Sequence, residues 1–126
     1  MKKIIKRTVS TIVAAIVSTS LFLSVSAVSD QYTFPNGDTM YATLDVSSTS
    51  IESKTTIGIG YTAVAQIKAQ YYVKGTTTVR NARDTKTGYS GGAIARVSNG
   101  GGTWISATSS NSAENGTYSH LITLNW

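Results

Sequence analysis

The sequence of 126 residues contains no cysteine, one proline and one histidine, and only six of its residues are acidic. Without cysteine the protein forms no disulfide and has neither a thiolate metal site nor a cysteine nucleophile. A metal site built on the single histidine would need carboxylates as its other ligands, and the aspartates and glutamates are scattered singly. We therefore expect no metal ion and no cofactor. The length fits one domain.

Acidic side chains are also missing from the first 29 residues, whose charges are four basic residues at the start, Lys2, Lys3, Lys6 and Arg7. An uncharged stretch follows, with apolar runs within residues 12–23 and small residues up to Ala27, which is the order of a secretory signal peptide. A retained membrane anchor is the alternative, because about 20 uncharged residues can cross a bilayer. Serine and threonine interrupt the run repeatedly, so we expect a signal peptide over residues 1–27 and a secreted domain over residues 28–126.

Cleavage after Ala27 would remove four positive charges and change the formal charge from +5 to +1. We therefore expect no nucleic-acid partner, because binding to phosphates depends on basic groups that would be lost. The remaining charges are unevenly distributed along the chain. Residues 30–52 are mainly acidic, whereas residues 68–96 include six basic side chains opposed only by Asp84.

After residue 28 apolar and polar residues alternate with period two, which is the pattern of β-strands, and no segment has helical spacing. The longest alternating run covers residues 57–73 and would extend about 55 Å if straight, so we expect a bend at Gly58–Gly60 or near Val64. Residues 93–109 are predicted to form a β-hairpin around a glycine-rich turn. The pattern predicts an all-β fold, a small antiparallel β-sandwich of six or seven strands. The other predicted strands cover residues 40–46, 76–83, 93–98, 103–109 and 117–126.

Both tryptophans, Trp104 and Trp126, are expected in the core. An exposed Trp126 would instead indicate an interaction patch. In the last strand His120 shares a face with Tyr118 and Ile122, so we expect a partly buried histidine bonded to a neighbouring hydroxyl.

The segment Gly88–Gly92 matches the G-x-S-x-G motif, and Ser90, Glu114 and His120 follow the chain order of a hydrolase triad. That motif requires a turn between a strand and a helix on a parallel sheet, and no helical pattern follows Ser90. We therefore interpret the segment as a glycine-rich loop that exposes Tyr89, and we expect no catalytic residue.

Basic residues interleave with tyrosines between residues 68 and 96, a composition that binds anionic polymers or lipid headgroups. One alternative is that this segment pairs with the acidic segment 30–52 across adjacent strands. Another is that residues 57–73 form a pore-lining hairpin, although three alanines would then face the lipid. The candidate binding residues are Lys68, Lys74, Arg80, Arg83, Lys86 and Tyr89.

The C-terminal half also carries a resemblance. The segment Thr76–Asn81, the following Asp84–Lys86, a glycine-rich turn and the terminal Asn125–Trp126 resemble the lactococcin-type bacteriocins over residues 68–126. The resemblance implies export by the general secretory route, a small β-sandwich, and binding of a cell-wall precursor lipid that blocks septum formation. The present chain has an additional N-terminal part, and no binding residue is transferred from that family.

Together these patterns predict a secreted, non-catalytic β-sandwich that binds a cell-envelope component or an extracellular protein. Two alternatives stay open, a bacteriocin acting on the cell wall of related bacteria and an inhibitor of an extracellular enzyme that inserts the loop of residues 88–92. Contact with a membrane and the oligomeric state also stay open.

Overall fold

The structure, a computed structural model, describes residues 8–9 and 26–126, so most of the predicted signal peptide lies outside the described residues. The described chain forms nine strands and no helix, and hence no helix long and apolar enough to cross a membrane. The strands are β1 (Thr8–Val9), β2 (Ser26–Thr33), β3 (Thr39–Val46), β4 (Ser50–Thr56), β5 (Thr62–Tyr72), β6 (Val79–Gly88), β7 (Gly92–Ser98), β8 (Thr103–Glu114) and β9 (Ser119–Asn125).

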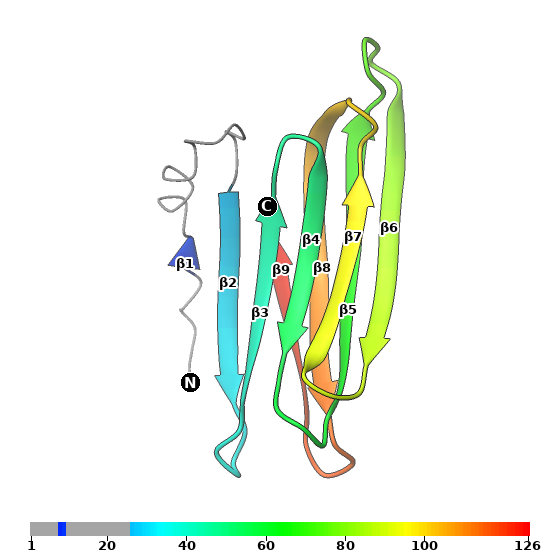
Figure 1. The fold of residues 1–126 in the computed structure, drawn as a ribbon. Coiled ribbons are helices and arrows are strands. Elements are labelled where there is room, and N and C mark those ends of the chain that lie inside the picture. Colours follow the sequence, from blue (N-terminus) through cyan, green and yellow to red (C-terminus); the bar gives the residue numbers. More distant parts are fainter. Residues whose placement is uncertain (1–7, 10–25) are drawn as a thin grey trace.

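The strands form two antiparallel sheets. Sheet A has the order β1-β2-β3-β4-β7, and sheet B has the order β6-β5-β8-β9 (Figure 1). The inner faces of both sheets contribute side chains to one buried cluster, so the sheets pack face to face. The predicted all-β antiparallel fold is confirmed, and the arrangement is compatible with a β-sandwich that has more strands than the six or seven expected.

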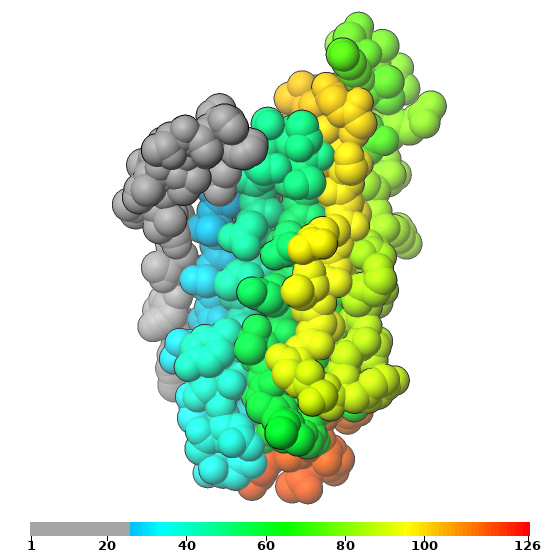
Figure 2. Space-filling model, viewed as in Figure 1, coloured from blue at the N-terminus to red at the C-terminus, as the bar shows by residue number. Residues whose placement is uncertain are grey.

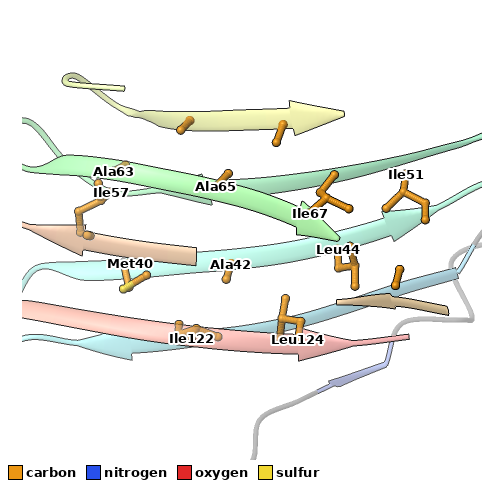
Figure 3. Packing of buried hydrophobic residues seen from close by; sticks show 14 of the residues in the cluster. Met40, Ala42, Leu44, Ile51, Ile57, Ala63, Ala65, Ile67, Ile122 and Leu124 are labelled. Carbon is orange, nitrogen blue, oxygen red and sulfur yellow. The ribbon is translucent and has the colours of Figure 1, made fainter. Parts of the chain in front are cut away.

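The core follows from the period-two alternation of the strands. On β3 the residues Met40, Ala42 and Leu44 are fully buried, and on β5 Ala65 and Ile67 are fully buried on the facing sheet (Figure 3). Burying a Leu, Ile or Met side chain contributes about 1.5–3 kcal/mol. Because the side-chain period is two, a register slip of one residue would turn this whole apolar set toward solvent, and the core therefore fixes the register.

The predicted seventeen-residue strand over residues 57–73 is wrong. Only β5 is a strand, and the preceding residues form a connection that carries the chain from sheet A to sheet B. Gly60 has φ 97°, a left-handed conformation that reverses the chain, so the expected bend is a complete turn. Ile57 and Tyr61 on either side are buried, which explains why the apolar alternation runs through the turn unbroken.

The predicted hairpin over residues 93–109 is also wrong. β7 pairs with β4, whereas β8 pairs with β5 and β9, so the turn between β7 and β8 crosses from one sheet to the other. The buried Asn99 holds this crossing, since its side-chain amide donates to Ser48 O at 2.9 Å and its side-chain oxygen accepts from Gly101 N at 3.0 Å. A glycine-rich turn can connect two strands of one hairpin or carry the chain from one sheet to the other. Which strand β8 pairs with is decided by the sheet against which its apolar side chains are buried.

Three strands, the short β1 and the longer β2 and β4, were not predicted. β2 begins at Ser26, so the predicted domain boundary after Ala27 falls inside this strand. On β4 the inward positions include the polar Ser53 and Thr55, which weaken the apolar alternation. Both side chains are fully buried and accept hydrogen bonds at 2.9 Å from the side-chain amide of Asn111 on β8.

The sheets also meet along their two open sides. Between β2 and β9 the Tyr32 and His120 rings stack with centroids 3.6 Å apart. Between β6 and β7 the Asp84 carboxylate accepts the backbone N–H of Arg96 at 3.0 Å. His120 is partly buried as expected, but its described contact is this aromatic ring and not a hydroxyl.

The two tryptophans differ. Trp104 is buried as predicted, and its indole N–H donates to Ser47 O at 3.1 Å. The prediction of a core position for Trp126 is wrong, since this side chain is 43% exposed and donates to the Ser26 hydroxyl at 2.8 Å. Trp126 lies just beyond the end of β9, and its side-chain hydrogen bond reaches the first residue of β2.

Candidate binding surface

All six candidate binding residues belong to the β5–β6 hairpin or to the loop after it, but they point to different sides. Lys68 and Arg83 lie on the outer face of sheet B, opposite the core. Arg80 and Lys86 alternate with Arg83 and therefore lie on the other side of β6. Lys74 and Tyr89 lie at opposite ends of β6, so the structure brings together Lys68 and Arg83 and separates the others.

Lys68 and Arg83 are direct cross-strand partners in the β5–β6 register, and both are exposed. Like charges directly opposite each other on neighbouring strands destabilise a sheet. Among the described residues the ion pairs are Lys86–Asp84 and Arg96–Glu52, so neither member of this cationic pair has an acidic partner there. The pair is a local electrostatic cost that the described part of the protein does not compensate.

A like-charge pair on sheet A provides a contrast. Asp45 and Glu52 are also direct cross-strand partners, but Arg96 on the next strand binds Glu52 with its guanidinium, Nε to Oε2 at 2.7 Å. Burial, followed by the charge of Glu52, raises the pKa of the Asp45 carboxyl. The acidic pair therefore has a cation bound to it within its own sheet, whereas among the described residues no carboxylate forms an ion pair with the cationic pair.

A shallow hollow of about 290 Å³ is lined by both cations and by the next cross-strand pair, Gln70 and Asn81. Its rim includes the Gln70 side-chain amide, which donates to the side-chain oxygen of Asn81 at 3.2 Å. A β-bulge beside Gln70 shifts the register of β8 by one residue at this point, and such bulges commonly re-aim side chains. The hollow is lined by Lys68, Ala69, Gln70, Asn81, Ala82, Arg83 and Ser106.

This hollow can accept an anion. The Lys68 ammonium has three N–H donors, and the Arg83 guanidinium is a planar fork that fits carboxylate and phosphate oxygens. Charge-assisted hydrogen bonds of this type are about twice as strong as neutral ones. The nearest acidic residue along β6, Asp84, is occupied on the other side of the strand, and the Arg96 amide and then Lys86 hold the pKa of its carboxyl below the usual value.

The far half of the hairpin carries further positive charge, although Arg80 lies on the opposite side of β6 from Arg83. Lys74 and Arg80 add two further cations without an ion-pair partner in the described residues. Figure 2 shows this end of the hairpin projecting beyond the neighbouring loops. Tyr72 and Val79, which are cross-strand partners, are both exposed at the same end. The sequence also allowed the basic segment to pair with the acidic segment across adjacent strands. The structure shows such an ion pair between Arg96 and Glu52 on sheet A.

The G-x-S-x-G segment forms the loop between β6 and β7 and exposes Tyr89, whose side chain is 73% accessible. Gly92 has φ 140°, and a Cβ there would lie 2.0 Å from Thr55 O, so this glycine serves close packing. A strand and not a helix follows Ser90. In the described part of the chain no three His, Asp or Glu side chains gather as they would around a metal ion.

Comparison with known proteins finds no matching family model, no similar curated protein and no similar solved structure. The functional interpretation therefore depends on the geometry of the site. Sequence reasoning identified both cations but missed Gln66, Gln70 and Asn81 around them. The two glutamines could have been found from the sequence. Side chains alternate along a strand, so residues 66 and 70 must lie on the same face as residue 68.

Proposed function

We propose that the protein is a secreted, non-catalytic β-sandwich that binds an anionic component of a cell envelope through the outer face of its β5–β6 hairpin. The observation that carries the proposal is the cross-strand pairing of Lys68 with Arg83 without an acidic partner in the described residues. Natural proteins break such local rules mainly at functional sites. An anion bound between the two side chains would turn the repulsion into attraction.

The distribution of charge supports a local contact over general adsorption. Without residues 1–27 the chain would carry seven basic and six acidic residues and would be nearly neutral. Five of the seven basic side chains, Lys68, Lys74, Arg80, Arg83 and Lys86, belong to one hairpin. The cell envelope is the proposed source of the anion because the N-terminal pattern predicts secretion.

The test is a binding assay of the full chain with isolated cell-envelope fractions. The variant Lys68→Gln/Arg83→Gln should lose about tenfold or more in affinity, since each hydrogen bond to a charged group contributes about 1.5–3 kcal/mol. The matched control, Lys54→Gln/Arg96→Gln, removes the same charge from the outer face of sheet A and should bind within about twofold of wild type. Equal losses in both variants would indicate non-specific attraction, and unchanged binding in both would refute the proposal.

A second candidate function is favoured by the opposite end of the molecule. Ile59 and Tyr89 are 84% and 73% exposed in two loops that are joined by a hydrogen bond from Ile57 N to Gly91 O of 3.2 Å. Two apolar side chains on adjacent glycine-flanked loops fit the insertion of this end into a partner protein, as in an inhibitor of an extracellular enzyme. Retention of a partner by wild type but not by Ile59→Ser/Tyr89→Ser would support this candidate.

The bacteriocin resemblance remains a proposal that builds on envelope binding. Addition of the purified protein to cultures of related bacteria should then inhibit growth, and Lys68→Gln/Arg83→Gln should be less potent. Normal growth across a broad panel of related strains would argue against an antibacterial role and would leave envelope binding intact.

A further inference from the structure

We propose that the occupant of this surface is a hydroxyl-rich anionic polymer, a polysaccharide or polyol chain with phosphate or carboxylate groups, lying along β5. This inference rests on the proposed function and names the chemical class of its ligand. Its anionic group would lie between Lys68 and Arg83, and its hydroxyls would bind amide and hydroxyl side chains on either side.

The cationic pair is flanked by two neutral side-chain pairs on the same face of sheet B. Two residues before Lys68, the Gln66 amide donates to the Thr85 hydroxyl at 3.1 Å. Two residues after it, the Gln70 amide donates to Asn81 at 3.2 Å. Each pair joins β5 to β6 directly across the register. Successive pairs on one face lie about 6.6–6.8 Å apart, so the three pairs cover about 13 Å of an extended ligand.

These flanking pairs keep unused hydrogen-bonding capacity. A glutamine amide that donates one N–H still has a second N–H and its carbonyl oxygen. The Thr85 hydroxyl accepts from Gln66 and retains its own hydrogen, and Asn81 accepts through its oxygen and retains its NH₂ group. The cross-strand bonds also hold these side chains in place, so less conformational entropy is lost when a ligand binds. Alternating donors and acceptors of this kind match the hydroxyls of a sugar or polyol.

The rest of the face continues the same chemistry. On β8 and β9 the outward positions carry mainly hydroxyl and amide groups, and the Thr108 hydroxyl donates to the side-chain oxygen of Asn125 at 3.0 Å. At the end toward the hairpin tip the exposed Tyr72 offers an aromatic ring, the usual partner for the apolar face of a sugar ring. A small free anion would contact only the two cations. The uncharged hydroxyl and amide groups around them could bind only a larger ligand, so the surface as a whole is better matched to a polymer.

A lipid membrane is the less suitable occupant. Residues 74–78 at the projecting tip of the hairpin are lysine, glycine and threonines, so the tip has no apolar side chain to enter the bilayer. The exposed Tyr72 and Val79 lie on the strands behind the tip. A face built from amides and hydroxyls would be costly to remove from water without hydrogen-bonding partners, which lipid tails do not supply.

The test is calorimetric titration of the full chain with defined probes. Polygalacturonate and poly(glycerol phosphate) carry both charge and hydroxyls, polyphosphate carries charge alone, dextran carries hydroxyls alone, and phosphatidylglycerol vesicles represent a membrane. We expect tighter binding of the first two than of polyphosphate, dextran or vesicles. Comparing carboxylate with phosphate polymers then identifies the anionic group.

Two double variants separate the inference from the proposed function. Gln66→Ala/Gln70→Ala should weaken binding of the hydroxyl-bearing anionic polymers about tenfold while leaving the salt dependence unchanged, since two neutral hydrogen-bonding groups are lost. Lys68→Gln/Arg83→Gln should reduce the salt dependence itself. The control Gln31→Ala, on the outer face of sheet A, should bind as wild type does. Circular dichroism and the thermal midpoint verify that each variant is folded.

The outcomes are distinct. If the glutamine variant binds normally, or if polyphosphate binds as tightly as the hydroxyl-bearing polymers, the surface is an anion site only, and this inference fails while the proposed function stands. If vesicles alone bind, the polymer is the wrong class. If the cationic variant also leaves binding unchanged for every probe, both the inference and the proposed function fail.

Discussion

Replacing Asn111 by alanine should destabilise the protein by about 4 kcal/mol, because it leaves two buried hydroxyls without a partner and opens a cavity. The Asn111 side chain is fully buried and donates to the Ser53 hydroxyl, the Thr55 hydroxyl and Lys54 O. It also accepts from the Ser109 hydroxyl at 2.8 Å. In the variant the hydroxyls of Ser53 and Ser109 lose these partners, whereas Thr55 keeps its bond to a backbone carbonyl.

Thermal and urea unfolding followed by circular dichroism would measure the effect. For a domain of this size 1 kcal/mol corresponds to about 4–8 °C, so the midpoint should fall by roughly 16–32 °C. The matched control Ser110→Ala, at the neighbouring outward position of β8, should change the free energy of unfolding by less than about 0.5 kcal/mol.

A triple variant tests the mechanism. Asn111→Leu with Ser53→Ala and Ser109→Ala removes the polar groups from both sides of the core, and such paired replacement is close to neutral. It should therefore recover most of the stability that Asn111→Ala loses. A loss below about 1 kcal/mol in the single variant, or no recovery in the triple variant, would refute the reasoning that this polar group stabilises the core.

Three further predictions concern other parts of the molecule. Burial lowers the pKa of His120, so as pH falls this side chain is protonated in the unfolded chain before it is protonated in the folded protein. The thermal midpoint of wild type should therefore drop between pH 8 and pH 5.5. The midpoint of His120→Gln, which lacks the titrating ring beside Tyr32, should drop less. The hydrogen bond that the Asp84 carboxylate accepts from the Arg96 backbone amide lowers the pKa of this carboxyl below 3.8. Asp84→Asn should therefore lower the thermal midpoint at pH 7. The difference in midpoint between this variant and wild type should vanish as pH falls through the lowered pKa. Gly92→Ala should destabilise the protein by at least about 2 kcal/mol, measured by urea unfolding, because its Cβ would clash with Thr55 O.

The fold could be predicted wherever a strand has one apolar and one polar face. The strand over residues 40–46 was found because every inward side chain is apolar. β4 was missed because a buried network satisfies the polar Ser53 and Thr55, and the partner that satisfies them is distant in sequence. The chain order of turns and strands likewise could not decide between a hairpin and a crossing at Asn99, since that choice depends on which sheet buries the next strand.

The candidate surface could be predicted only in part for a related reason. Its charges are visible in the composition of the segment, but the pairing of Lys68 with Arg83 depends on the register set by the turn between β5 and β6. The sequence placed the second of these strands at residues 76–83, whereas it covers Val79–Gly88. Alternation within the predicted strand already separates Arg80 from Arg83, but Lys86 lies beyond its predicted end, and the cross-strand partner of each side chain depends on the register.

The stack of Tyr32 on His120 joins β2, near one end of the described chain, to β9 at the other. The sandwich therefore cannot close until its last strand is available, and long-range pairings of this kind fold slowly. Slow folding is useful to a chain that must remain unfolded while it passes through a secretion channel, as the proposed secretion would require. The order of the strands would then delay folding until the whole domain has reached the far side of the membrane.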